Sequence, residues 1–510
     1  MTHSLPRLLA LRRTALRLVL PLLLFAAAVG SGCVTTGTNP VSGNTRAYAY
    51  SWEEEVKLGT EADQQIQQQY GVYDDEELQE YVDRVAQDVL AESHMRRPST
   101  PEKFRNTEFH FRVLDSPIIN AFALPGGYVY VTRGLMAHLN NEAQLAVVLG
   151  HEIGHVAGRH ASKQGAKQQL MQGVLLGGAV ASQVAFGGEV GENVLGIGGT
   201  ATQLLTLSYS RDNERESDRL GVEYAARAGY DAAEGAAFFT SLKRKSEQSG
   251  QDIPTWQSTH PDPGQREDTI VELARQWDGK VEGTPDARNQ EAYYAAVENI
   301  VLGENPRNGF VENDVFYHPD LEFRFPVPAG WQTQNQASQV AMIQPNQEAY
   351  VVFRIAQAET PDAAAAEFTG QEGLTVVEQR TTQVNGHEAR RVLAEGQTQQ
   401  GQTVRALAYF IAYDDQVYSF QGLTTGPQYD TYRSALERPM TGFDALRDPE
   451  KLNVQPTRLA IRPAPRADAF RAFVDEDALP EDLSLNDLAI INQVQLDERI
   501  EQGRPLKLPE

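Results

Sequence analysis

The stretch His151-Glu152-Ile153-Gly154-His155 lies in a run that its hydrophobic pattern predicts as a helix, from about Asn141 to Ala161. Residues four apart on a helix share a face, so His151 and His155 can direct two imidazoles at one metal ion. Glu152 is rotated by about 100° from His151 and can reach a water molecule bound to that metal. The H-E-x-x-H spacing therefore predicts the zinc motif of a metalloprotease, with Glu152 as the catalytic general base.

The surroundings of this motif favour a metal site. The preceding residues, Ala143 to Gly150, are apolar and small, which indicates a buried helix. Two histidines and a glutamate in a buried helix are costly without partners, and a metal ion supplies one. The alternative is a polar helix with two satisfied histidines. Gly154 leaves room for another backbone or a substrate to approach closely.

A second acidic motif, Asn213 to Gly221, offers the missing ligand. A catalytic zinc takes three protein ligands and keeps one open position. Glu214 and Asp218 are four apart and share a helix face, so Glu214 can ligate the metal while Asp218 accepts a hydrogen bond from a ligand histidine. Glu216 points to a different side and is given no role. The alternative is an exposed helix face with salt bridges between neighbouring turns.

Several stretches together resemble one known family. They are Asn120 to Gly127, Arg133-Gly134-Leu135, the H-E-x-x-H segment, Glu214 to Gly221 and His260-Pro261. This combination resembles the HtpX and CAAX-prenyl-protease type of zinc metallopeptidase (the minigluzincins), in its periplasmic BepA-like lipoprotein branch. The resemblance covers roughly residues 50 to 275.

The resemblance implies roles for several residues. It makes Glu214 the third metal ligand, places Asp218 behind a ligand, and puts His260 at the metal or beside it, where it restrains or assists catalysis. A surface histidine is the alternative for His260. Ser217 stands where the family usually has alanine, which leaves both acidic positions intact. Outside this resemblance, Arg266 could contact substrate or an acidic partner; the favoured alternative is that it has no such role.

A strand beside the metal is expected to hold the substrate. A protease must bind an extended peptide, and an exposed strand edge does so through backbone hydrogen bonds. By resemblance and by this logic, the segment Ala121, Phe122, Ala123 and Leu124 is assigned to substrate binding. The alternative is a plain structural hairpin around Pro125-Gly126-Gly127.

The N-terminus is typical of an exported lipoprotein. Residues 1–32 carry four arginines and then an apolar run, Leu18 to Val29, that is too short to span a membrane. Cys33 is the only cysteine and resembles a lipidation site, although Gly30 stands where leucine is usual. Residues 33–50 are expected to form a flexible tether. The alternative is ordinary secretion with an inert thiol; by resemblance, Val34 after the cysteine favours the outer membrane.

The whole chain is expected to be α+β. Its 510 residues suggest three or four domains. A mainly helical zincin metallopeptidase domain with a small sheet is assigned to residues 51–305. An α+β domain over 311–445 weakly resembles PsbP-like domains, and a small module over 456–510 faintly resembles LysM, with a non-binding module favoured. Tetratricopeptide repeats, frequent in the related branch, are not visible.

Two further features limit the class of function. The formal net charge of the chain is −24, whereas nucleic-acid-binding proteins usually carry a basic surface. No nucleic-acid partner is therefore expected. The Gly- and Ala-rich stretch Leu170 to Leu207 is too interrupted for a membrane span. The resemblance implies a mobile lid over the cleft or a segment that meets a membrane-assembly partner; a packed helical hairpin is an equal alternative.

These observations predict a zinc endopeptidase of the cell envelope of a Gram-negative-type bacterium, anchored to the periplasmic face of the outer membrane. One Zn²⁺ is expected on His151, His155 and Glu214, with Glu152 moving the proton and His260 supporting the developing charge. By resemblance, the substrates are misfolded or stalled envelope proteins. One alternative is a non-proteolytic or latent assembly factor that keeps the zinc fold, and another is a cell-wall anchor that binds peptidoglycan through its terminal module.

Overall fold

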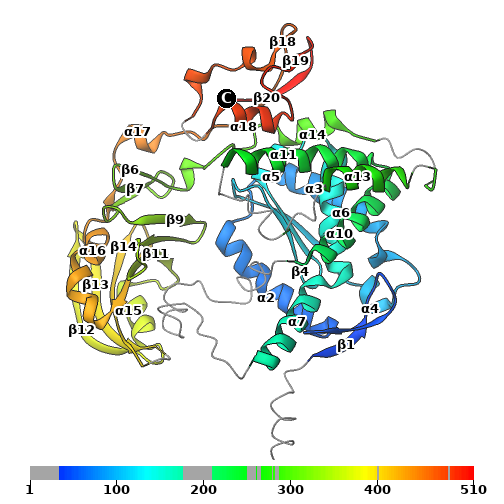
Figure 1. The fold of residues 1–510 in the computed structure, drawn as a ribbon. Coiled ribbons are helices and arrows are strands. Elements are labelled where there is room, and N and C mark those ends of the chain that lie inside the picture. The colour runs from blue at the N-terminus through cyan, green and yellow to red at the C-terminus, as the bar shows by residue number, and fades with distance from the viewer. Residues whose placement is uncertain are drawn as a thin grey trace, which may run out of the picture.

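The structure is a computed structural model that describes residues 34–175, 209–249, 260, 266–277, 279–281, 287–398, 401–480 and 483–510. Figure 1 shows a mainly helical unit, a unit built on a large sheet, and a small C-terminal module beside the helical unit. The expected signal peptide, Cys33 and most of the Leu170 to Leu207 stretch lie outside the described residues. Within them, no helix is both long and apolar enough to cross a membrane.

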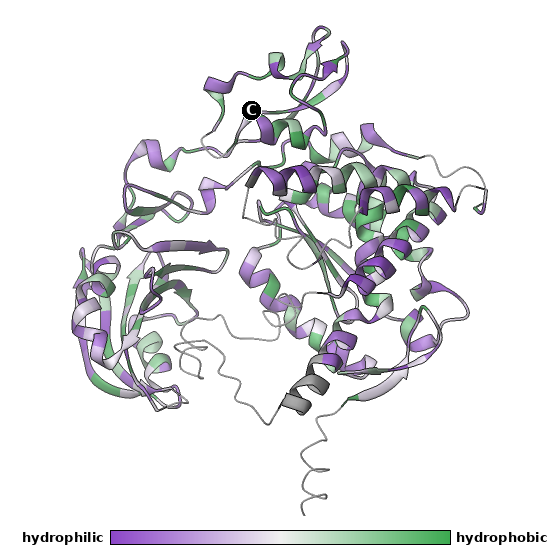
Figure 2. Ribbon diagram, viewed as in Figure 1, coloured by the Kyte–Doolittle hydropathy of each residue, from purple (hydrophilic) through white to green (hydrophobic). Residues whose placement is uncertain are grey.

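The helical unit begins with two long helices, α2 (Trp52–Tyr70) and α3 (Glu76–Ala91). Ser51 caps α2 in a capping box with Glu54, and the helix ends at Gly71, whose φ of 72° suits glycine. Both helices bury most of their apolar residues and expose mainly polar ones. Figure 2 shows hydrophilic and hydrophobic residues mixed along the helices of this unit.

A three-stranded sheet lies beneath these helices. It has the order β3-β5-β4, with β3 (His110–Leu114) parallel to β5 (Tyr128–Thr132) and β4 (Ala121–Leu124) antiparallel to β5. The β4–β5 turn passes against α2, where a Cβ on Gly126 would lie 2.6 Å from Val56 Cα. β4 is thus an edge strand of a sheet that α2 and α6 cover.

Two helices carry the sequence motifs and pack directly on each other. They are α6 (Glu142–Gly158) and α10 (Arg211–Arg227). Their backbones meet at two glycines: a Cβ on Gly150 would lie 2.9 Å from Gly221 O, and one on Gly221 would lie 2.8 Å from His151 N. This close approach brings both motifs to the same place.

The other helices of this unit complete its apolar core. Their bounds are α4 (Glu102–Arg105), α5 (Arg133–His138), α7 (His160–Leu175), α11 (Gly235–Ser249), α13 (Arg266–Arg275) and α14 (Gln290–Val297), with 3₁₀ turns η1 (His94–Arg96), η2 (Ala232–Glu234) and η3 (Pro306–Asn308).

The tether expected over residues 33–50 is wrong for its described part, which forms an ordered hairpin. β1 (Thr35–Thr38) pairs antiparallel with β2 (Thr45–Tyr48). Tyr48 is fully buried, with the Arg159 guanidinium 3.6 Å from its ring centre, and Asn39 Nδ2 donates to Gly158 O at 3.1 Å. Threonines, which favour strands, and these contacts with the end of α6 outweigh the polar composition.

The second unit is built on a seven-stranded antiparallel sheet with the order β12-β13-β14-β15-β11-β10-β9. Helix α16 (Tyr429–Thr441) joins the apolar core on one face and α15 (Pro361–Thr369) the core on the other. The strands are β9 (Gln332–Gln336), β10 (Gln339–Ile343), β11 (Ala349–Ala356), β12 (Thr375–Val384), β13 (His387–Gln397), β14 (Thr403–Tyr413) and β15 (Gln416–Thr425).

A four-stranded sheet with the order β16-β8-β7-β6 packs beside it, and β8 pairs with both β7 and β16. This second sheet joins the core on the α16 face through the phenylalanines of β7 and β8. Its elements are β6 (Phe310–Glu312), β7 (Val315–His318), β8 (Phe323–Pro326) and β16 (Asp444–Ala445), with η4 (Gly426–Gln428) and α17 (Pro449–Leu452) nearby in the chain.

The C-terminal module is not separate from the helical unit. Leu302 N donates to Thr457 O at 2.9 Å, so the chain leaves the helical unit and returns to it at adjacent points. Lys507 Nζ donates to Ala137 O and Leu139 O, both at 2.6 Å, at the end of α5. One apolar cluster contains residues of both parts and none of the sheet unit. The sheet unit is therefore inserted into a body formed by the other two.

The module itself is small and mixed. Its outer strands pair antiparallel, β17 (Leu459–Pro463) with β20 (Pro505–Pro509), and α18 (Leu485–Ile491) lies between them in the chain. The remaining elements are β18 (Asp468–Ala469), η5 (Phe470–Phe473), η6 (Glu476–Ala478) and β19 (Arg499–Ile500).

Candidate metal centre

The first motif sits on α6, whose residues are all buried. Asn141 caps this helix by accepting a hydrogen bond from Gln144 N, and the helix ends at Arg159, which has a left-handed backbone. His151, Glu152 and His155 are 1%, 0% and 3% exposed. Helical spacing therefore brings both imidazoles to one face, as the sequence predicts.

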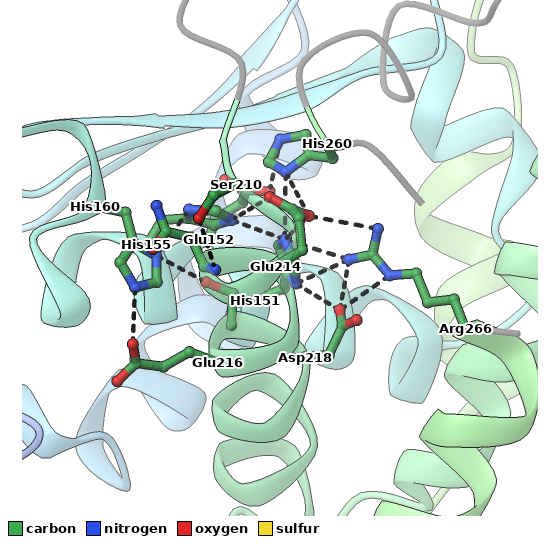
Figure 3. A network of polar contacts seen from close by, with 12 residues as sticks. His151, Glu152, His155, His160, Ser210, Glu214, Glu216, Asp218, His260 and Arg266 are labelled. Atoms are coloured by element: carbon green, nitrogen blue, oxygen red, sulfur yellow. Dashed lines mark hydrogen bonds and ion pairs between the residues drawn. The ribbon is translucent and has the colours of Figure 1, made fainter. Parts of the chain in front are cut away.

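Glu214 of α10 faces this pair. Its Oε2 lies 3.5 Å from His151 Nε2 and its Oε1 lies 3.4 Å from His155 Nε2, while the two Nε2 atoms are 2.9 Å apart. His260 completes the group, in which one ligand atom from each of the four residues lies within 4.8 Å of the others. Figure 3 shows the four side chains converging.

The donor set fits a divalent metal. Glu214 Oε1 and both carboxylate oxygens of Glu152 are buried and accept no hydrogen bond from the part of the chain that the structure describes. Buried carboxylate oxygens without donors are costly, and a cation would satisfy them. Two imidazoles and a carboxylate are also the ligand set of many catalytic zinc sites. His151, His155 and Glu214 are the residues that would hold the ion.

His260 lies inside the cluster and not on the surface. It is 1% exposed, with Nδ1 at 3.3 Å from both His151 Nε2 and Glu214 Oε2. Its Nε2 lies 3.8 Å from Glu152 Oε1. The alternative of a surface histidine is therefore wrong, and His260 is within reach of both the metal ligands and Glu152.

Asp218 lies behind the ligands. Its Oδ1 is 2.9 Å from His151 Nδ1, so it accepts a hydrogen bond from the ring nitrogen that faces away from the cluster. Arg266 donates to the same oxygen from Nε at 3.0 Å and from Nη2 at 2.5 Å. The two contacts fix the carboxylate against His151.

Arg266 is buried, so the structure does not support the less favoured interpretation that it contacts substrate or an acidic partner. Arg266 is 3% exposed, and its guanidinium lies 4.2 Å from the Phe239 ring centre and 3.6 Å from Glu214 Oε2. Its positive charge lies beside the carboxylates of Glu214 and Asp218 in the interior of the protein. Residue spacing could not reveal this role, because α13 and α10 are separate helices with no periodicity that relates Arg266 to Glu214 or Asp218.

A second chain of contacts supports the other histidine. His155 Nδ1 lies 3.2 Å from His160 Nδ1, and His160 Nε2 lies 3.3 Å from Glu216 Oε2. With His155 Nε2 facing the cluster, its Nδ1–H donates to His160, and His160 Nε2–H then donates to Glu216. Ser217 Oγ also lies 3.3 Å from His160 Nδ1. Glu216, which the sequence left without a role, thus stands at the end of this hydrogen-bonded relay.

Charges in the site shift the pKa values of the first motif. Burial and Arg266 lower the pKa of His151, but hydrogen bonds to Asp218 and Glu214 outweigh them and raise it to about 9. Burial raises the pKa of Glu152 above its usual value. A carboxylate with a raised pKa is a better proton acceptor near neutral pH.

The two supporting carboxylates shift the other way. Burial raises the pKa of Glu214, but His260 and His151 outweigh it and hold the pKa well below the usual range. The hydrogen bond from His160 is the largest of the effects that lower the pKa of Glu216 to about 2. Both carboxylates are therefore charged at neutral pH.

The strand assigned to substrate lies beside the cluster. Ala123 and Leu124 line a small pocket with His155 and Tyr209. β4 pairs with β5 alone among the described strands, so one side of its backbone has no strand partner. All four residues from Ala121 to Leu124 are nonetheless buried, because their side chains pack alternately toward α6 and toward α2. The sequence predicts an exposed strand edge, but the residues of β4 are buried in the structure.

Residues 75–274 match the model of peptidase family M48. The chain carries an M48 peptidase domain. It is 29% identical over 231 residues to the beta-barrel assembly-enhancing protease of Escherichia coli (strain K12), covering 45% of each chain. It is 33% identical over 171 residues to the mitochondrial metalloendopeptidase OMA1 of Bos taurus, covering 32% of each. The M48 domain holds His151, His155, Glu214 and His260.

These similarities concern part of the protein. The chain spans about half the length of the curated relatives it matches, such as the beta-barrel assembly-enhancing proteases. Among solved structures, cyanobacterial PsbP from Synechocystis sp. PCC 6803 is similar to 26% of this chain and 91% of its own, with 10% identity and a TM-score of 0.21.

Proposed function

We propose that the protein is a zinc-dependent endopeptidase that hydrolyses misfolded or stalled proteins of the cell envelope. The observation that carries this proposal is Glu152. A glutamate with both oxygens buried and unbonded among the described residues has no structural use, but it lies beside a cluster of three histidines and a glutamate. Such a carboxylate suits proton transfer at a metal-activated water.

His151, His155 and Glu214 would hold the zinc ion. Zinc bound there would polarise the scissile carbonyl and lower the pKa of a water molecule. Asp218 keeps the His151 ring in the tautomer that turns Nε2 toward the cluster, and His160 does the same for His155. These contacts fix both rings before a substrate binds.

Glu152 moves the proton. Its carboxylate takes a proton from the attacking water and returns it to the amine that leaves. His260 Nε2 lies on the same side of the cluster, 3.8 Å from Glu152 Oε1, so it can donate to the charge that develops on the carbonyl oxygen. His260 Nδ1 also lies 3.3 Å from Glu214 Oε2. Through this contact with a metal ligand, His260 can restrain the site in the resting protein.

The substrate would lie along β4. Its unpaired backbone side is next to His155, so an extended peptide could add there as a further strand. All four residues of β4 are buried, so the peptide would need access to this edge before it could bind.

The cellular setting is part of the proposal. The N-terminal pattern supports export and lipidation at Cys33, and with it attachment to the periplasmic face of the outer membrane. Similarity to beta-barrel assembly-enhancing proteases supports envelope proteins as substrates.

The decisive experiment compares purified wild type with Glu152→Gln and His260→Ala on casein and envelope extract, with zinc content measured for each. We expect wild type or His260→Ala to cleave, and Glu152→Gln to keep zinc but lose at least a hundredfold in activity. Higher activity of His260→Ala than of wild type would make His260 a restraint. Zinc binding by all three without any cleavage would contradict the proposal and favour a non-proteolytic assembly factor.

A further inference from the structure

A polar groove separates α2 of the helical unit from the seven-stranded sheet. Two adjoining cavities of about 670 and 730 Å³ form it, and both are lined by Gln336, Gln339, Arg354 and Ile355. Glutamines of α2, Gln69 among them, line the opposite wall. In Figure 1, α2 lies between the sheet unit and β4.

The floor of the groove is a row of side chains across neighbouring strands. Gln339 of β10 pairs with Arg354 of β11, Arg354 with Ser419 of β15, and Ser419 with Phe410 of β14. Directly paired residues in antiparallel strands point to the same face. The strand register, and not a chance meeting of surface loops, therefore places these groups side by side.

Arg354 is a cation without a counterion. It is half-buried, and it makes no hydrogen bond or ion pair with the described part of the chain. Burial lowers its pKa, and no acidic neighbour offsets that effect. The carboxylate among the described residues that line the first cavity, Glu367, is exposed and does not pair with it. In a chain with a formal charge of −24, a partly desolvated cation left unpaired calls for an anionic ligand.

A buried acceptor stands two residues along from this row. Gln421 of β15 is 4% exposed and lines the same cavity. Its Nε2 donates to Ser419 Oγ at 3.1 Å, whereas its Oε1 accepts no hydrogen bond within the described ranges. The first cavity thus offers a cation for an anion and an acceptor for an N–H group.

The second cavity adds apolar surface. Six large hydrophobic side chains of the described residues are more than a third exposed, and three of them line this cavity: Val72, Ile118 and Ile355. Exposed aliphatic side chains beside polar groups mark binding surfaces. The combination suits a polypeptide, which presents amides, aliphatic side chains and carboxylates along one extended chain.

We propose that this groove binds an extended segment of polypeptide through a carboxylate held by Arg354, with the neighbouring N–H bonded to Gln421 Oε1. The inference deepens the proposed function, because it makes the sheet unit a substrate-holding site outside the metal centre. α2 is the shared wall: its Ala62 and Ile66 pack with Phe122 and Leu124 of β4 on one side, and its glutamines face the groove on the other. A chain held in the groove would therefore lie on the opposite side of α2 from β4.

The test is direct binding, measured by fluorescence anisotropy on the full chain. The probe is a labelled ten-residue peptide of alanine, glutamine and valine in three forms: a free C-terminal carboxylate, a C-terminal amide, and the amide with one internal aspartate. We expect the free acid to bind at least tenfold more tightly than the amide, since a charge-assisted bidentate contact distinguishes them. If the internal aspartate restores binding, the carboxylate comes from a side chain; if it does not, the chain terminus is recognised.

The variants are Arg354→Gln and a matched control, Arg380→Gln, on the exposed strand β12 of the same sheet. We expect Arg354→Gln to abolish the preference for the free acid and to leave the melting temperature equal or higher, because it removes an unpaired cation. Arg380→Gln should bind as wild type does. Equal binding of acid and amide by wild type, or an unchanged preference in Arg354→Gln, would overturn the proposal.

The same measurements separate this inference from the peptidase itself. Anisotropy needs no turnover, so binding through Arg354 in a protein that cleaves nothing would keep the groove and reject the endopeptidase. Cleavage of casein without carboxylate-dependent peptide binding would keep the endopeptidase and reject the groove.

Discussion

Single side chains behind the ligands decide how firmly the site holds its metal. We expect His160→Ala to weaken zinc binding about tenfold to a hundredfold, the usual cost of losing a hydrogen bond to a ligating imidazole. Glu216→Gln should weaken it less, because Glu216 acts only through His160 and glutamine keeps an acceptor oxygen. The reason is geometric: His160 Nδ1 accepts from His155 Nδ1, and Glu216 holds His160 in that tautomer. Competition with a coloured chelator gives the affinity without any activity assay.

Glu77→Gln is a suitable control, since it makes the same change on the exposed face of α3. It should leave zinc affinity unchanged. If His160→Ala bound zinc as tightly as wild type, the relay would be a packing feature and not a support of His155.

The sequence could predict the ligands but not this support. His151, His155 and Glu214 follow from four-residue spacing on two helices, a purely local regularity. Glu216 points away from Glu214, as predicted, and contacts His160. His160 lies close to Glu216 because α6 ends at Gly158 and the chain turns back at Arg159. Contacts that depend on where a helix ends have no periodicity to reveal them.

At the scale of elements, the site exists because α6 and α10 touch at glycines. We expect Gly221→Ala to destabilise the protein by about 1–3 kcal/mol, because its new Cβ would meet His151 N at 2.8 Å and Val147 O at 3.0 Å. Separating the helices would also draw Glu214 away from the two histidines. Thermal unfolding and zinc affinity should therefore change together.

Gly426→Ala provides the comparison, because a Cβ there would make only ordinary contacts, the nearest at 3.4 Å to Thr403. It should change the melting temperature little. A Gly221→Ala protein with normal stability and normal zinc affinity would show that α10 can shift without cost, contrary to the packing described here.

Over the whole molecule, the sequence predicted the order of the parts better than their connections. The helices, the strands of the sheet unit and an α+β class follow from periodicity and turn residues. The docking of residues 456–510 does not, because it rests on a few long-range contacts such as Lys507 on the carbonyls of Ala137 and Leu139. The tether expectation failed for a similar reason, since the partner of Tyr48 is Arg159, more than a hundred residues away.

This connectivity makes two deletions behave in opposite ways. Removing residues 456–510 should unfold the M48 domain, because it strips a shared apolar core and leaves the carbonyls that Lys507 satisfies without a donor. Replacing residues 306–453 by a short Gly-Ser linker should leave it folded, since Leu302 and Thr457 are already hydrogen-bonded neighbours.

Zinc content and circular dichroism of the two proteins give the answer. We expect the insertion-deleted protein to keep its zinc and one cooperative unfolding transition, and the C-terminally truncated protein to lose both. A soluble, zinc-loaded truncation would instead make the C-terminal module an independent domain. Only in that case would peptidoglycan pull-down with and without residues 456–510 be a clean test of cell-wall binding. With a shared core, the pull-down needs the full chain and point variants on the exposed face of the module.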